Sequence, residues 1–322
     1  SYSDCGSLVF RAADGTELAH DVDTWNTDGV SAVWVNVPET SSATEIVMEW
    51  YSAAGVSAVN PASTWAGYRS VWHLSEAGTN AVHADASGNS LALAGQNGTV
   101  AAVGVVGNGR TISDISDWGS ISAGGQNNGR GLVASGYAAA GSLPAPFTIS
   151  FWAKHREGAD VFFDYLFSRK SGGSAAFCSQ LWYYGNEYGN YQHNMQIKSS
   201  VDGGTYVVNS ASPFPNGEWR YLSFAVGSDS TLDVYENGEL RQHIDGFVYT
   251  DNQTALSFGN LSSLDDMSWN GEFDEIRVAA TKRSAAQVEA EYLAMSDAAY
   301  VSFSAVREVD GTAETGLVII LR

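Results

Sequence analysis

Positive charge is scarce in this 322-residue sequence. Lysines and arginines together number 16 against 36 aspartates and glutamates, so the formal net charge is −20. A negative field of this size repels phosphate backbones and anionic lipid headgroups. We therefore expect no nucleic-acid partner and no binding to an anionic membrane surface.

Long apolar runs are missing as well. No run of about 18 apolar residues occurs, so the sequence predicts no membrane insertion. The sequence begins with Ser1, without an initiator methionine, and its first residues show no signal-peptide pattern. We expect a mature or excised piece of a longer exported protein, located outside the cell or on its surface.

Cysteine is limited to Cys5 and Cys178. In an exported protein a disulfide between them would tie the N-terminal region to the rest of the chain. Two unpaired buried thiols are the alternative, because free cysteine behaves as a small apolar residue. The histidines show no His-Glu-x-x-His spacing of a zinc site. His73 lies on an apolar strand pattern, where we expect a core histidine with satisfied hydrogen bonds.

Strand patterns dominate what is present. Residues 147–154 (FTISFWAK) alternate apolar and polar side chains, as a half-buried strand does. Residues 217–240 contain two further strands, and Asn237-Gly238 is placed to close another hairpin with a primed turn. Residues 270–292 combine a strand with a helix that begins at the capping box from Ser284 to Gln287. The sequence predicts an all-β fold with one short C-terminal helix.

These segments resemble the concanavalin A-like jelly roll of the laminin-G type. The resemblance implies a jelly-roll β-sandwich over residues 68–299, opened by YRSVWHL and the loop from Asp85 to Asn89. Among its best strand motifs, Phe151 and Trp152 are expected in the core. The resemblance marks Trp219, in GEWRYLSF, most firmly as core.

Two further units flank the predicted sandwich. Residues 1–67 resemble a small β-domain of unknown function that precedes laminin-G-like domains in exported bacterial proteins, and we expect it to dock on the sandwich. Residues 300–322 contain two short apolar strands. The second, Leu317 to Leu321, would be an aggregation hazard if left unpaired. We expect it to pair with the N-terminal unit of its own chain, or with a neighbouring molecule in self-association.

An aromatic cluster lies in the Gly- and Asn-rich stretch SQLWYYGNEYGNYQHN. Aromatic faces stack on the C–H faces of sugar rings, while amides and hydroxyls bind sugar hydroxyls. The stretch is therefore a candidate glycan-binding surface, although alternate members could instead be core residues. Its candidates are Trp182, Tyr183, Tyr184, Tyr188, Tyr191 and His193.

Oxygen donors gather in the loop from Asp85 to Asn89, and Asp274 begins a late strand. Calcium prefers six to eight oxygen ligands supplied by loops. In the family that the chain resembles, aspartates at both places approach one calcium ion, which implies a Ca²⁺ site made by Asp85, Asn89 and Asp274. The alternative is that Asp85 and Asn89 form an Asx-turn.

The segment GEFDEIRV also invites comparison with laminarinase-type glycoside hydrolases, which share the sandwich. There, alternating carboxylates on one strand act as nucleophile and general acid. Glu272 and Asp274 alternate here, but Glu275 is adjacent to Asp274 and should point to the opposite face. Ile276 and Arg277 occupy the positions that the acid needs. The spacing therefore disfavours catalysis.

The hypothesis that these features favour is a non-catalytic extracellular module that binds carbohydrate or mediates adhesion. The alternative is a structural subunit of a cell-surface assembly or filament. A third hypothesis is a glycoside hydrolase of the laminarinase type.

Overall fold

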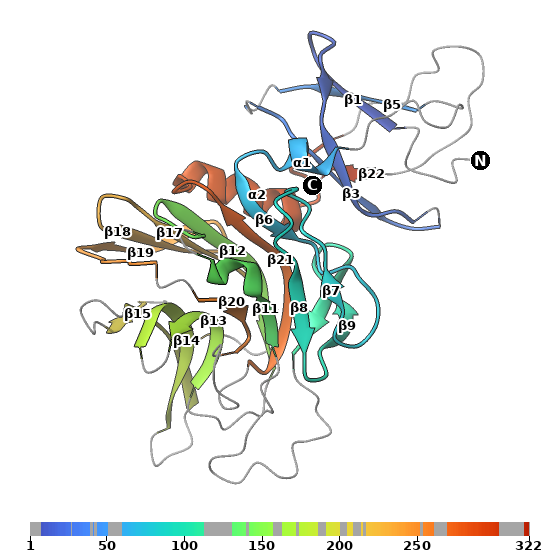
Figure 1. Cartoon of the computed structure of the whole chain (residues 1–322). Coiled ribbons are helices and arrows are strands. Elements are labelled where there is room, and N and C mark those ends of the chain that lie inside the picture. The colour runs from blue at the N-terminus through green and yellow to red at the C-terminus, as the bar shows by residue number, and fades with distance from the viewer. Residues whose placement is uncertain are drawn as a thin grey trace, which may run out of the picture.

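A computed structural model gives the fold of the chain (Figure 1). It describes residues 8–26, 28–38, 41, 44–50, 60–112, 131–139, 142–156, 163–171, 174–185, 191–199, 205–208, 214, 217–251, 254–260, 269–302 and 319–321.

Two large β-sheets form the body of the molecule. The strands of the first sheet are β6 (Tyr68–Trp72), β9 (Val100–Val103), β10 (Asn108–Thr111), β12 (Phe147–His155), β17 (Trp219–Val226), β18 (Thr231–Glu236), β19 (Glu239–Asp245) and β21 (Gly271–Ala279). Their order is β19-β18-β17-β12-β21-β10-β9, with β6 also paired to β21. Every pairing among them is antiparallel.

The second sheet lies against the first. Its strands are β7 (Val82–His83), β8 (Leu93–Gln96), β11 (Gly131–Ala134), β13 (Phe163–Ser171), β14 (Ser174–Gly185), β15 (Tyr191–Ser199), β16 (Thr205–Val207) and β20 (Leu256–Phe258). Their order is β16-β15-β14-β13-β20-β11-β8-β7. A short 3-10 helix, η3 (Ser135–Ala138), follows β11. This antiparallel sandwich confirms the predicted jelly roll.

The main core fills the space between the two sheets. Phe151 of β12 is fully buried, and its ring lies 5.6 Å from Phe273 of the same sheet and 5.7 Å from Phe258 of the other. Alternation along β12 places Trp152 on the opposite face, where it packs with Met295 of the helix α2 (Ala285–Ser296). Both core predictions for β12 are confirmed.

Trp219 departs from expectation. It is only partly buried and packs on the outer, helix-covered face of the first sheet, with the Lys154 ammonium 5.4 Å from its ring. The strand is where the sequence predicts it, but the Trp219 side chain is only partly buried, unlike that of Trp152 on the same face. The prediction that Trp219 is a principal core residue is therefore wrong.

Local predictions for the hairpin and the helix are confirmed. Asn237 and Gly238 link β18 to β19 with φ values of 51° and 81°, both positive as a type I′ turn requires. The Ser284 side chain accepts a hydrogen bond from the Gln287 amide, and the reciprocal bond completes the capping box at the start of α2. Neither described helix is long and apolar enough to cross a membrane.

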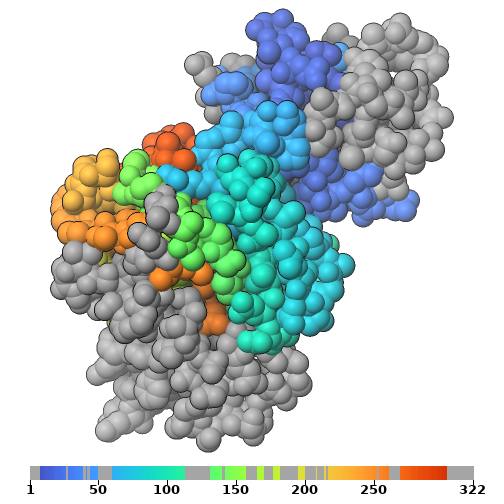
Figure 2. Space-filling model, in the orientation of Figure 1, coloured from blue at the N-terminus to red at the C-terminus, as the bar shows by residue number. Residues whose placement is uncertain are grey.

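The N-terminal unit, defined here as the part of the chain that carries β1 to β5, forms two small sheets beside the sandwich. The strands are β1 (Leu8–Ala12), β2 (Glu17–Leu18), β3 (His20–Thr24), β4 (Ser31–Val35) and β5 (Ile46–Trp50), and the helix α1 (Pro61–Thr64) leads to β6. The sheet orders are β2-β1-β5 and β22-β4-β3. The unit projects from one side of the sandwich (Figure 2).

The C-terminal strand β22 (Ile319–Leu321) pairs in parallel with β4. The tail therefore adopts the intramolecular pairing, one of the two arrangements expected for it. Val301, the first residue of the preceding apolar segment, packs against the N-terminal cluster of Leu8, Phe10, Leu18 and Val33.

Candidate functional site

The predicted aromatic cluster lies on two neighbouring strands of the second sheet. The register of β14 and β15 pairs Trp182 with Asn194, Tyr183 with His193 and Tyr184 with Gln192. Tyr191 pairs with Gly185 where the two strands approach their connection. Tyr188 lies outside the described residues. The fold thus brings five of the six candidates to one end of the sheet.

A row of polar side chains continues from these positions along the same sheet. Gln180 lies between the core-side positions Ser179 and Leu181, so it faces away from the inter-sheet core. Its amide Nε2 donates a 3.2 Å hydrogen bond to Oε1 of Gln196 on β15. We call the following set the polar row: Ser168, Gln180, Gln196, Ser257 and Asn260.

The polar row contains buried groups without partners. Gln180 and Ser257 are fully buried and Asn260 is 5% exposed, yet Gln180 Oε1, Ser257 Oγ and Asn260 Oδ1 accept or donate no hydrogen bond. Leaving such a group unpaired costs about 1–3 kcal/mol. Buried amide and hydroxyl groups in this state need an ordered water as partner, because a ligand cannot reach them.

Sequence reasoning missed the polar row. Gln180 is a polar residue in the mainly apolar β14, which is a usable signal, whereas Gln196 lies in β15, where most residues are polar. Ser257 and Asn260 carry no such signal, because only the pairing of β20 with β13 and the 3.1 Å bond from Ser168 Oγ to the Asn260 carbonyl place them beside the glutamines.

The side chains of the predicted calcium loop form hydrogen bonds within the loop and with neighbouring backbone. Asp85 Oδ1 accepts from the backbone amides of Val71 and Ser87, each at 3.0 Å, and Oδ2 accepts from the Leu91 amide at 3.0 Å. The Asn89 side-chain amide donates to the Tyr68 carbonyl at 3.1 Å. The bond from the Ser87 amide to Asp85 is that of an Asx-turn, the alternative drawn from the sequence.

Asp274 is held by backbone amides of a different loop. Its Oδ2 accepts from Val105 at 2.7 Å and from Val106 at 2.8 Å, and its Oδ1 accepts from the Glu275 amide at 2.8 Å. Burial and the charge of Glu275 raise the pKa of Asp274 well above its usual range, which favours the uncharged acid. These contacts satisfy both aspartates without an ion, and calcium binding stays a prediction.

A β-bulge changes the face on which Glu275 lies. The register between β12 and β21 shifts between Ser150 and Trp152, and Glu275 adopts φ = 47° in the left-handed region. Its carboxylate reaches Arg277 at 2.7 Å on the outer face, so the expectation that Glu275 points to the opposite face from Asp274 is wrong. Strict alternation fails here because the bulge adds one residue.

Comparison with known proteins places the chain in a family. Residues 127–289 match the laminin-G type model of the concanavalin A-like lectin/glucanases superfamily. The chain belongs to this superfamily. No curated protein sequence matches it.

Several solved lectin/glucanase-like structures are similar to this chain. Domain 4 of an extracellular GH43 arabinanase from Geobacillus stearothermophilus, in complex with arabinotriose, is 17% identical, covers 69% of this chain and 96% of its own, and has a TM-score of 0.47. The binding domain of botulinum neurotoxin serotype D is 12% identical, with 70% and 51% covered and a TM-score of 0.48. A pentraxin from Limulus polyphemus is 16% identical, with 46% and 70% covered and a TM-score of 0.36.

The carboxylates compared with those of a glucanase are engaged in structural contacts. Glu272 forms ion pairs with Lys154 at 3.2 Å and with Arg156. Glu272 and Asp274 share the outer face of the first sheet, as their alternation predicts, because they pair with Lys154 and Trp152 of β12. This face lies on the other side of the molecule's core from the polar row.

Cys178 is a buried residue of β14 in the lectin/glucanase sandwich. Its predicted disulfide partner, Cys5, lies outside the described residues. The disulfide therefore stays a prediction.

Proposed function

We propose that this lectin/glucanase-type chain is an extracellular, non-catalytic module that binds carbohydrate through the β14–β15 end of its second sheet. The observation that carries the proposal is the register of β14 and β15, which gathers five of the six predicted sugar-binding residues at one end of the second sheet. Aromatic rings and neutral amides together are the chemistry that recognises sugar rings and their hydroxyls.

The charge of the chain favours neutral sugars. The residues that the register pairs at the β14–β15 end, 182–185 and 191–194, include no carboxylate, lysine or arginine. The net charge of −20 repels polyanions such as acidic polysaccharides. We therefore expect neutral glycans to bind and uronic-acid or sulfated glycans to bind more weakly.

The test is a glycan array with the folded chain, followed by calorimetric titration of the best neutral ligand. Trp182→Ala should weaken binding at least tenfold, which corresponds to about 1.4 kcal/mol. Trp219→Ala, on the first sheet, is the matched aromatic control and should leave affinity unchanged.

Three outcomes would contradict the proposal. An array without any bound glycan would remove the function itself. Equal loss for Trp219→Ala and Trp182→Ala would indicate a stability effect instead of a site. Release of reducing sugar from the bound glycan would show that the chain is an enzyme.

A second role in a cell-surface assembly is favoured by the position of β22. This strand is at the edge of its sheet, with β4 on one side and no strand on the other among the described residues. Unprotected edges are templates for pairing with another chain. We propose this edge as the contact if the chain self-associates, and a concentration-dependent increase in its mass, measured by light scattering, tests it.

A further inference from the structure

One strand of the N-terminal unit belongs to two hydrophobic clusters at once. In β4, Val33 is part of the small core of the N-terminal unit, whereas Ala32 and Trp34 belong to a cluster with Trp152 and Met295 of the sandwich. Alternation along the strand separates these two sets. Both faces of β4 are therefore buried, one against its own unit and the other against the sandwich.

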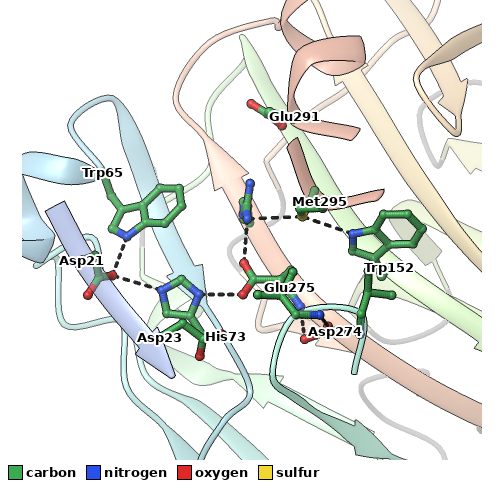
Figure 3. Close-up of polar contacts among 12 residues, drawn as sticks. Asp21, Asp23, Trp65, His73, Trp152, Asp274, Glu275, Glu291 and Met295 are labelled. Atoms are coloured by element: carbon green, nitrogen blue, oxygen red, sulfur yellow. Dashed lines mark hydrogen bonds and ion pairs between the residues drawn. The ribbon is translucent and has the colours of Figure 1, made fainter. Parts of the chain in front are cut away.

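A chain of hydrogen bonds runs through the same contact. His73, just after β6, bonds through Nε2 to Oδ2 of Asp21 at 3.0 Å and through Nδ1 to Oε1 of Glu275 at 2.8 Å (Figure 3). Trp65 Nε1 donates to the same Asp21 oxygen at 2.7 Å. Burial opposes a charge on the ring, but the carboxylates of Glu275 and Asp21 hold the pKa of His73 well above its usual range. The expected satisfied hydrogen bonds of His73 are confirmed, but its side chain is only partly buried and lies between the two units, outside the inter-sheet core.

Arg277 extends this chain on the sandwich side. It donates to Oε2 of Glu275 at 2.7 Å, and its guanidinium carbon lies 4.1 Å from the centre of the Trp34 ring. Trp34 comes from the N-terminal unit, so the contact is a cation–π bond between the two units. Two anions and two cations alternate along the line Asp21, His73, Glu275 and Arg277, which balances the buried charge.

The backbone at this contact is strained and closely packed. Glu275 is a non-glycine residue at φ = 47°, a conformation that persists where the surroundings enforce it. Gly107 of the sandwich approaches Thr24 of β3 so closely that a Cβ atom there would collide with the Thr24 hydroxyl. Neither unit can shift without breaking these contacts.

A metal ion does not explain the cluster. One imidazole nitrogen of His73 and one carboxylate oxygen each of Asp23 and Glu275 lie within 4.8 Å of one another. However, both ring nitrogens of His73 already lie at hydrogen-bond distance from carboxylates, Nε2 from Asp21 and Nδ1 from Glu275, so these ion pairs account for the arrangement. The geometry suits an ion-pair network between two units.

We infer that Asp21, Trp34, His73, Glu275 and Arg277 form an interdomain joint that holds the N-terminal unit and the sandwich as one rigid, cooperatively unfolding body. The joint fixes the direction in which the N-terminal unit projects, and that unit lies at the end of the molecule away from β14 and β15 (Figure 1). A segment attached through the N-terminal unit would therefore hold the second sheet at a fixed orientation.

The test uses the full chain in calorimetry and small-angle X-ray scattering. Asp21→Ala removes the acceptor of both Trp65 and His73. The matched control is Asp14→Ala, because Asp14 is exposed and its hydrogen bonds are to Thr16 in its own turn. The unmodified chain and the control should unfold in one transition. Asp21→Ala should unfold in two, the first being that of the N-terminal unit, with a larger radius of gyration before it.

His73→Gln is the second variant, in case Asp21→Ala does not fold. It should also divide the transition and enlarge the radius. Two transitions in the unmodified chain would overturn the inference. So would a single transition with an unchanged radius of gyration in both variants, since the joint would then add stability without holding the units together.

Discussion

Phe151 is the residue whose truncation should damage the sandwich most clearly. Its side chain is fully buried, and aromatic rings surround it from both sheets: Phe224 and Phe273 from the first, Phe167 and Phe258 from the second. Alanine at this position would leave a cavity that no single neighbour can fill, because all four rings are held by their own strands.

The magnitude follows from the buried area. A phenylalanine side chain buries roughly 150–200 Å², and about 25 cal/mol per Å² gives roughly 4–5 kcal/mol. Phe→Ala substitutions in cores cost about 3–5 kcal/mol, which agrees. In a domain of this size about 1 kcal/mol shifts the melting temperature by roughly 2–4 °C, so Phe151→Ala should lower it by about 10 °C.

Urea titration followed by tryptophan fluorescence measures the free energy of unfolding directly. Phe151→Leu is the milder control, because leucine removes less apolar volume than alanine does, and it should lose clearly less stability than Phe151→Ala. Trp219→Ala, from a half-buried position on the outer face, should lose clearly less than Phe151→Ala despite the larger side chain. A loss below about 1 kcal/mol for Phe151→Ala, or an equal loss for Trp219→Ala, would refute the assignment of the two faces.

Three further predictions concern pH, calcium and the tail. Burial, followed by the charge of Glu275, raises the pKa of Asp23 to about 7. Because the unfolded chain releases this proton near pH 4, the free energy of unfolding should fall by roughly 4 kcal/mol as the pH rises from about 4 past 7. Asp23→Asn should flatten this pH dependence of the free energy of unfolding, measured in melts at a series of pH values. If calcium binds, removing it from a solution whose free calcium is 100 times the dissociation constant should lower the free energy of unfolding by about 2.7 kcal/mol, and chelation should change nothing in Asp85→Ala. Identical melts of the unmodified chain with and without chelator would contradict the calcium site. Deleting residues 316–322 should lower stability without dividing the unfolding transition, because β4 loses its pairing with β22; unchanged melting would assign the tail no structural role.

Much of the sandwich could be predicted from local patterns. The strand at 147–155, the hairpin around Asn237-Gly238 and the capped helix from Ala285 each depend on residues that are close in sequence. Only part of the candidate site could be predicted: the aromatic residues of β14 and β15 stand out in the sequence. The polar row does not, because it depends on the pairing of β13 with both β14 and β20.

The sequence by itself determined which segments are strands and where the turns lie, because alternation and turn chemistry act over a few residues. That these strands form a jelly roll came from their resemblance to a known family. Only the tertiary structure decided which face each strand buries. Phe151 and Trp219 are both aromatic residues in strong strand patterns, yet one lies between the sheets and the other on the outer face. The joint shows the same limit most clearly: Asp21, His73 and Glu275 are far apart in the chain, and a bulge at Glu275 reverses the face that simple alternation gives. Their meeting is set by how the sheets pair and pack, and no local pattern encodes it.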